Sequence, residues 1–332
     1  MPFRAIAGHR PLLELLSRAT ARATLPPSLI FAGPEGVGKR LTATALAQAL
    51  NCERPIEGED RRDACGTCAA CKRIARGVHA DILVIEPGDS GSIKVDQVRE
   101  AIDRSMYRPF EGRRRVVIVD EADALMPEAQ NALLKTLEEP PPASVFVLIT
   151  NRPDVLLPTV RSRCQVLRFG PLTPGEVAEV LMRDHGLEAA DAHAAAAAAD
   201  GSVGRALAGS AEDANEARDA AARLLQAAAS SQDPRRRLDG AKALTGGSGD
   251  RDDLARRLLA LCSLIRDLGL LLSRADDRAL ANTDLKPQLQ ALLRFFDGDR
   301  TVRAFATVER ALSALDRNAS PKIVADWLAL NI

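Results

Sequence analysis

The chain of 332 residues contains 45 basic and 45 acidic side chains, so its formal net charge at pH 7 is zero. This balance argues against a protein whose whole surface binds nucleic acid, although it leaves room for a local basic patch. The first twenty residues carry charge and do not resemble a signal peptide, and no uncharged stretch approaches the ~18 residues of a membrane-spanning helix. We therefore expect a cytoplasmic protein of about two domains of average size or three small ones, with no membrane partner.

Five short apolar runs, each bounded by Gly, Pro or Asp, recur in the first half of the chain. Because they do not alternate with polar residues, each is predicted to be a strand that is buried on both faces. Strands that alternate with helical patterns indicate a doubly wound parallel sheet, and therefore an α/β domain. The predicted strands are 28–33, 81–87, 115–122, 144–151 and 165–170, and the predicted helices are 39–50, 95–107 and 127–137.

The rest of the chain is predicted to be all-α, because its alanine-rich and leucine-rich patterns are typical of helices. Thr173 is a predicted N-cap, followed by Pro174 at the first helical position. The predicted organisation is an α/β domain over residues 1–170, a small helical domain over 171–210 and a second helical domain over 211–332.

The segment GPEGVGKR, which begins at Gly33, follows the first predicted strand and opens a helix. This is the context of a phosphate-binding loop of the form Gly-x4-Gly-Lys-Ser/Thr. Gly33, Gly36 and Gly38 would let backbone N–H groups surround the phosphates of ATP or ADP, and Lys39 would reach the β- and γ-phosphates. Arg40 departs from the pattern, which requires Ser or Thr at this position. An ordinary glycine-rich turn between a strand and a helix is the alternative interpretation.

Polar residues end two of the later strands. Asp120 and Glu121 follow the third predicted strand, where an acid beside a phosphate loop holds Mg²⁺ or its waters and the next glutamate could polarise an attacking water. The fourth strand ends at Thr150 and Asn151, where a polar side chain can sense a γ-phosphate. The alternatives are a strand that is stopped by solvated acids and an ordinary strand end.

Four of the six cysteines are clustered: Cys52, Cys65, Cys68 and Cys71 are separated by 12, 2 and 2 residues. In a cytoplasmic chain this clustering favours a metal over disulfides. Four sulfurs that leave no open position suit a structural tetrahedral zinc, and a redox dithiol is the alternative. The polar insert between the first two cysteines is expected to protrude. Cys262, in a leucine-rich run, is expected to lie in a helical core.

Together these segments resemble the AAA+ clamp-loader subunits of bacterial DNA polymerase III, and within that family the delta-prime type. The resemblance rests on specific motifs from residue 3 to about 210, and beyond that only on length and helical character. It implies an AAA+ P-loop domain with an inserted zinc module, a helical lid domain and a C-terminal collar domain. The segments that carry it are LPPSLIFAGPEGVGKR, YRPFEGRRRVVIVDEADALMPEAQNALLKTLEEPPPASVFVLITN, LLPTVRSRC, and IKVDQVRE, which favours delta-prime over gamma/tau.

The resemblance assigns roles to three arginines. Arg163, in the triplet SRC, would reach into a neighbouring subunit's ATP site as an arginine finger, whereas without the family it is a surface arginine in a loop. Arg205 matches the second sensor, which lies on the lid over the subunit's own nucleotide. In the hydrolysing subunits a hydroxyl after the loop lysine coordinates Mg²⁺, which Arg40 cannot do because it has no acceptor. Weak or absent ATP hydrolysis is therefore expected, while nucleotide binding stays open.

The resemblance also implies partners: an arc of five subunits that includes three gamma/tau subunits and one delta subunit, and that places a sliding clamp on primer-template DNA. An ATP-hydrolysing gamma/tau motor is the nearest rival, but it needs Ser or Thr at position 40. A zinc-dependent nucleic-acid-binding module with an inert phosphate loop is a rival of another class, and the zero net charge counts against it. The basic run 111–117 is expected to be a solvated turn rather than a phosphate contact.

Overall fold

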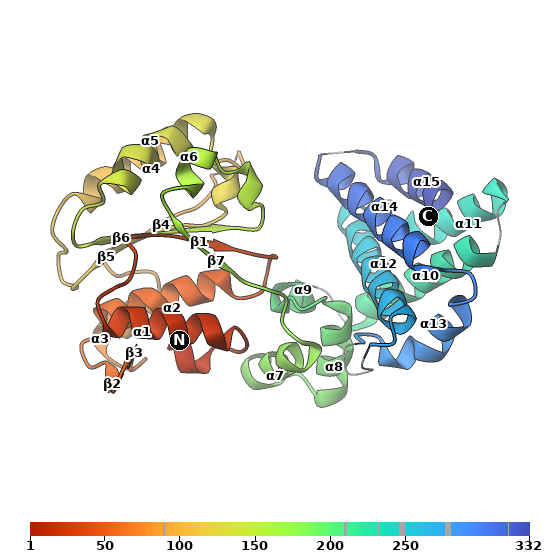
Figure 1. The fold of residues 1–332 in the computed structure, drawn as a ribbon, viewed down its shortest axis with the longest axis horizontal. Coiled ribbons are helices and arrows are strands. Elements are labelled where there is room, and N and C mark those ends of the chain that lie inside the picture. The colour runs from red at the N-terminus through yellow and green to blue at the C-terminus, as the bar shows by residue number, and fades with distance from the viewer. Residues whose placement is uncertain (89, 209–210, 231–232, 246–249, 276–279, 318) are drawn as a thin grey trace. The chain divides into compact units, whose positions relative to one another are not determined.

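The structure, a computed structural model, describes residues 1–88, 90–208, 211–230, 233–245, 250–275, 280–317 and 319–332. These residues form two compact units, Met1–Leu172 and Thr173–Ile332 (Figure 1). The predicted boundary between the small helical domain and the last domain falls at residues 209–210, which lie outside the described residues. The division of the second unit into a lid and a collar therefore remains a prediction.

A five-stranded parallel sheet forms the centre of the first unit, as predicted. The strand order is β4-β5-β6-β1-β7, so β1 lies between β6 and β7. Because all neighbours are parallel, the carboxyl ends of the strands meet at one edge of the sheet and the amino ends at the other. The strands are β1 (Ser28–Ala32), β4 (Ile82–Ile85), β5 (Arg115–Val119), β6 (Ser144–Thr150) and β7 (Gln165–Arg168).

The prediction of strands buried on both faces is right for the central strands and wrong for the two edge strands. Every residue of β1, β5 and β6 is buried. In contrast, β4 exposes Val84, and β7 exposes Gln165 and Arg168. These strands have a neighbour on one side only, so helices and loops cover them less completely.

Helices pack on both faces of this sheet, and each face has its own apolar core (Figure 1). Phe31 and Val147 point to the core that is shared with α1 and α2, whereas Ile30 and Phe146 point to the core that is shared with α4 and α5. Alternate residues of the same buried strand thus face opposite layers. The helices and the remaining short elements are η1 (Phe3–Ala5), α1 (Arg10–Ala21), α2 (Lys39–Asn51), β2 (Ile56–Gly58), β3 (Arg61–Asp63), α3 (Ala69–Ala75), α4 (Val95–Ser105), η2 (Ala122–Ala124), α5 (Pro127–Glu138), η3 (Pro153–Val155) and α6 (Pro158–Arg161).

The second unit is helical throughout its described residues, as predicted. Thr173 caps α7 through a capping box with Glu176, and Pro174 occupies the first turn, so the sequence signal for this helix is confirmed. Cys262 is buried in the core of this unit. No described helix has the length and apolarity needed to cross a bilayer. The helices are α7 (Pro174–His185), α8 (Ala189–Ala198), α9 (Val203–Ala208), α10 (Ala211–Ser230), α11 (Pro234–Thr245), α12 (Arg251–Leu272), η5 (Thr283–Leu285), α13 (Lys286–Leu292), α14 (Gly298–Asp316) and α15 (Pro321–Asn331).

Candidate functional site

The carboxyl edge of the sheet gathers the glycine-rich loop and the polar ends of three other strands. The loop that begins at Gly33 joins β1 to α2, while Glu86 follows β4, Asp120 follows β5 and Thr150 ends β6. The N-terminus of α2 opens at this edge, so its unpaired backbone N–H groups add positive potential there. This edge is where open α/β sheets commonly bind ligands.

The backbone of the loop requires its glycines. At Gly33 the φ angle is 156°, and a Cβ atom would lie 2.1 Å from the carbonyl oxygen of Phe169. At Gly36 and Gly38 the φ angles are 71° and 99°, in the left-handed region that disfavours other residues. The loop therefore packs its start against the end of β7 and turns sharply into α2.

Lys39 is the first residue of α2, and its side chain folds back into the loop. Its Nζ donates hydrogen bonds to the carbonyl oxygens of Gly33, at 2.6 Å, and Pro34, at 2.5 Å. Burial lowers the pKa of Lys39, although the nearby Glu35 and Asp120 carboxylates oppose this shift. The ammonium group thus sits where a phosphate held by the loop would need a positive charge.

Arg40 is held by two carboxylates at the same edge. Its Nη1 donates a hydrogen bond to Oδ2 of Asp120 at 2.8 Å and forms an ion pair with Glu86. In phosphate-loop proteins a hydroxyl at this position and the acid after the neighbouring strand hold Mg²⁺. Here the hydroxyl is replaced by a cation, and that cation engages the acid. These residues do not fit a magnesium ion in that place.

Glu121, the predicted water-polarising residue, adopts a left-handed conformation with a φ angle of 46° and is exposed. Its backbone N–H donates to Oδ1 of Asp120 at 3.0 Å. Burial raises its pKa, and the negative charges of Asp120 and Asp123 raise it further. The two acids after β5 therefore differ: Asp120 is paired with a cation, whereas burial and the neighbouring carboxylates raise the pKa of Glu121.

The end of β6 carries an interaction that sequence reasoning missed. The Thr150 hydroxyl donates to Oδ1 of Asp123 at 2.9 Å, and the Arg152 guanidinium pairs with the same carboxylate at 3.0 Å. Asn151, the predicted sensor, is exposed beside this network. The polar end of β6 is thus fixed by η2, which follows β5. In the sequence, the signal for this interaction is the acidic residue Asp123, which follows the third predicted strand.

Arg163 lies near the amino ends of the strands, whereas the phosphate loop lies at their carboxyl ends. It precedes β7, whose first residue Gln165 is in register with Leu29 near the start of β1. Its Nε donates to Oε1 of Glu138, the last residue of α5, at 2.7 Å, and its Nη1 donates to the Thr159 carbonyl at 2.9 Å. The structure therefore does not bring the predicted finger together with the phosphate loop of its own subunit.

Arg205, the predicted second sensor, belongs to α9 in the second unit. Its guanidinium lies 3.9 Å from a carboxylate oxygen of Asp200, which also pairs with Arg266 of α12. The phosphate loop belongs to the first unit. The role of Arg205 toward a nucleotide stays a prediction.

The four clustered cysteines come together as their spacing indicates. The sulfur atoms of Cys52, Cys65, Cys68 and Cys71 all lie within 4.8 Å of one another, and those of Cys52 and Cys68 are 3.9 Å apart. Zinc–sulfur bonds of about 2.3 Å in a tetrahedron would separate the sulfurs by about 3.8 Å. Backbone N–H groups also point at the sulfurs: Cys65 N–H donates to Cys52 Sγ at 3.2 Å, and Cys68 N–H donates to Cys65 Sγ at 3.3 Å. The donor set is compatible with a structural zinc.

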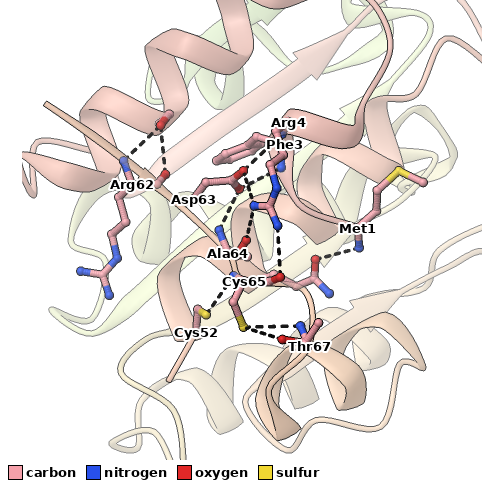
Figure 2. Close-up of polar contacts among 11 residues, drawn as sticks. Met1, Phe3, Arg4, Cys52, Arg62, Asp63, Ala64, Cys65 and Thr67 are labelled. Carbon is pink, nitrogen blue, oxygen red and sulfur yellow. Dashed lines mark hydrogen bonds and ion pairs between the residues drawn. The ribbon is translucent and has the colours of Figure 1, made fainter. Parts of the chain in front are cut away.

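The insert between the first two cysteines forms the antiparallel hairpin β2–β3. β2 is exposed at every residue, but β3 packs on α1, where Arg62 and Ser17 exchange two hydrogen bonds of 3.0 and 3.1 Å. Figure 2 shows that Asp63 accepts hydrogen bonds from the backbone N–H groups of Phe3, at 2.9 Å, and Arg4, at 3.2 Å. The Arg4 guanidinium donates to the carbonyl oxygens of Ala64 and Cys65. The module is thus tied to the chain's first residues rather than simply protruding.

The strand order, the glycine-rich loop between β1 and α2, and the acid after β5 define the first unit as a P-loop domain of the AAA+ type. A family model described as "DNA polymerase III, delta subunit" matches residues 8–173, which is half of the chain. The chain therefore belongs to this family.

Two known proteins illustrate the relationship. The chain is 41% identical over 167 residues to DNA polymerase III subunit delta′ of Pseudomonas aeruginosa, which covers 50% of this chain and 49% of that protein. It is 35% identical over 181 residues to DNA polymerase III subunit gamma/tau of Mycobacterium tuberculosis, covering 54% of this chain and 31% of that protein. The match thus spans about half the length of the first relative and less of the second. The resemblance to clamp-loader subunits of the delta-prime type is confirmed.

Among solved structures, the chain is similar to a gamma subunit-related protein of Thermotoga maritima. The sequence identity is 18% and the TM-score is 0.36, with 89% of this chain and 98% of that chain covered.

Proposed function

We propose that the chain acts as the delta-prime subunit of a DNA polymerase III clamp loader. In this cytoplasmic complex it would assemble with gamma/tau and delta subunits, and the complex would place a sliding clamp on primer-template DNA at the expense of ATP. Membership of the delta subunit family and the identity to a delta′ subunit support this function. The observation that carries the proposal is the position of Arg163.

Arg163 is exposed to solvent over about a third of its side chain at the amino edge of the sheet. The loop with Lys39 is at the carboxyl edge of the same sheet. In the proposed complex, a guanidinium on the side of the sheet opposite its own loop would contribute to phosphate chemistry at a neighbouring subunit's site. Its planar fork of donors suits the oxygens of a γ-phosphate in the transition state.

The chain's own phosphate loop would support weak ATP hydrolysis or none. Arg40 takes the place of the hydroxyl that a motor uses for Mg²⁺, and it engages Asp120. Without a metal, Glu121 has no activated γ-phosphate to direct water against. This pairing supports a subunit that acts as a scaffold in the complex, with weak or no ATP hydrolysis of its own, over an ATP-hydrolysing gamma/tau subunit. Asn151 and Arg205 are proposed to sense the nucleotide that the loop binds.

The remaining parts would have structural roles. The four cysteines would hold one zinc ion that organises residues 52–71 and, through Asp63, the N-terminus. The helices after residue 211 would form the collar through which the subunits associate.

The experiment is to assemble the complete clamp loader with the Arg163→Ala variant and to measure ATP turnover and subunit stoichiometry. We expect a full complex whose ATP turnover is reduced, because one gamma/tau site loses its finger. Arg161→Ala is the matched control, since Arg161 lies two residues away on α6 and pairs with Asp154 at 2.8 Å. Normal turnover in the complex with Arg163→Ala would refute the proposed role, and so would failure of the unaltered chain to enter the complex.

A further inference from the structure

Two acidic residues and one arginine form a network of ion pairs beside the phosphate loop. Nη1 of Arg40 contacts Oδ2 of Asp120 at 2.8 Å and pairs with Glu86, which follows the edge strand β4. Arg40 belongs to α2, Asp120 follows β5 and Glu86 follows β4, so the arrangement depends on the strand order. Glu86 belongs to no phosphate-loop motif, and its part in this network is visible only in the fold.

The guanidinium occupies this place with spare capacity for hydrogen bonds. Its contacts with both acids use Nη1, and neither Nη2 nor Nε donates a hydrogen bond to any of the described residues. A guanidinium has five N–H donors, so donors remain for phosphate oxygens. Lys39 adds a second positive charge, next to the N-terminus of α2. The loop thus carries two side-chain cations where its class has one lysine and one magnesium ion.

A magnesium ion would have to displace this arginine. Mg²⁺ demands near-octahedral oxygen ligands, and the Asp120 oxygen that faces the loop accepts from Arg40 instead. A magnesium–nucleotide complex would also bring the metal's positive charge toward that of the Arg40 guanidinium. Binding of the metal complex is therefore opposed twice, whereas a metal-free nucleotide meets two cations.

We propose that this loop binds the free form of a nucleoside di- or triphosphate, with the Arg40 guanidinium in the place of the divalent cation. The inference rests on the proposed function's reading of the loop as a nucleotide site. Glu86 and Asp120 act as positioning residues that hold the guanidinium at the carboxyl edge. The bound nucleotide is a stable structural ligand rather than a substrate, because no metal draws electrons from its γ-phosphate.

The test is calorimetric titration of the full-length chain with ADP and with ATP, in excess EDTA and in excess MgCl₂. The unaltered chain is expected to bind at least as tightly in EDTA, because Mg²⁺ withdraws the free nucleotide into its complex. Arg40→Thr frees Asp120 and supplies a hydroxyl, so its affinity should be about tenfold or more higher with Mg²⁺ than with EDTA. Arg40→Lys keeps a cation and should, like the unaltered chain, bind at least as tightly in EDTA as with Mg²⁺, but its binding should be weaker overall because the planar fork is lost.

Arg99→Thr is the control, since Arg99 is an exposed arginine of α4 that pairs with Asp96, at 3.6 Å. It should titrate as the unaltered chain does, and circular dichroism would establish that each variant is folded. Two results would overturn the inference: binding by the unaltered chain that Mg²⁺ strengthens about tenfold, or no binding under either condition. Neither result bears on the finger, which is tested in the assembled complex through Arg163.

Discussion

Arg163 and Glu138 form an ion pair at the amino edge of the sheet, with Nε of the arginine 2.7 Å from Oε1 of the glutamate. The pair joins Arg163, two residues before β7, to the last residue of α5. The guanidinium that we propose for a neighbouring ATP site is therefore engaged within its own subunit. In the proposed complex the neighbour's nucleotide would have to compete with Glu138 for this guanidinium.

The first prediction follows from this competition. Glu138→Gln removes the charge that holds Arg163, so the assembled complex should reach its full ATP turnover at lower ATP concentration. The free energy of unfolding should change by no more than about 0.5 kcal/mol, because the pair is exposed on both sides. Glu128→Gln, at the exposed start of the same helix, is the control. An unchanged dependence on ATP concentration would show that Glu138 does not restrain the finger.

The second prediction concerns Asp81, which is fully buried and accepts backbone N–H bonds from Phe110, Glu111 and Gly112. Burial opposes its ionisation, but these N–H groups and the Arg115 guanidinium lower its pKa to about 2. Because the folded-state pKa lies below that of the unfolded chain, the carboxylate stabilises the fold above about pH 4. This stabilisation is lost as the pH falls from about 4 to about 2.

Asp81→Asn should therefore lower the free energy of unfolding by about 3 kcal/mol at pH 7, because it leaves the buried Arg115 without its charge partner. Urea unfolding at pH 7 and pH 3 would measure this, and the difference between variant and parent should shrink at the lower pH. Asp96→Asn, at an exposed site on α4, is the control and should unfold as the parent does. A constant difference at both pH values would contradict the assignment.

The third prediction concerns zinc. Metal analysis should find one zinc ion per chain, and Cys68→Ser should lose it, whereas Cys164→Ser should retain it. Burial raises the pKa of Cys164 to about 12, so it stays a thiol outside the cluster. Removal of zinc by a chelator should speed hydrogen exchange at the amides of Phe3 and Arg4, because both donate to Asp63 in the same module. Unchanged exchange at these two amides would mean that the N-terminus keeps its hydrogen bonds to Asp63 without the metal.

The fourth prediction separates two kinds of glycine in the phosphate loop. Gly33→Ala places a methyl group against the Phe169 carbonyl, so it should lower the free energy of unfolding by about 3 kcal/mol or more. At Gly38 no atom lies within 4 Å of an added Cβ, so Gly38→Ala should cost only backbone strain of about 1–2 kcal/mol. Thermal unfolding of both variants would test the order, and an equal loss would contradict it.

Sequence patterns predicted the parts of this molecule that are encoded locally. Apolar runs predicted the five strands of the parallel sheet, and the cysteine spacing predicted a cluster whose sulfur atoms lie within 4.8 Å of one another. The missed features join distant segments: Asp120 is 80 residues from Arg40, and Glu138 is 25 residues from Arg163. Such partners follow from strand order and from where a helix ends, which no local pattern records.

The basic run 111–117 shows the same limit. It was expected to be a solvated turn, and Arg113 is indeed exposed. Arg115, however, is buried and pairs with Asp81, which is 34 residues earlier in the chain. From the sequence alone, a buried arginine at the start of a strand cannot be told from a solvent-exposed one, because its partner lies far away in the chain.

The two unlike edges of the parallel sheet give this domain a direction. A subunit that offers an arginine from one edge and receives one at the other associates head to tail, and such contacts continue until a ring closes or a member fails to propagate them. In the proposed complex this chain would offer Arg163 at the amino ends of its strands, while the site at their carboxyl ends already contains Arg40. We expect such a subunit to stand at the end of a row of ATP-hydrolysing subunits, because its own phosphate loop has no place for a neighbour's arginine. It would thereby limit the number of subunits in the row.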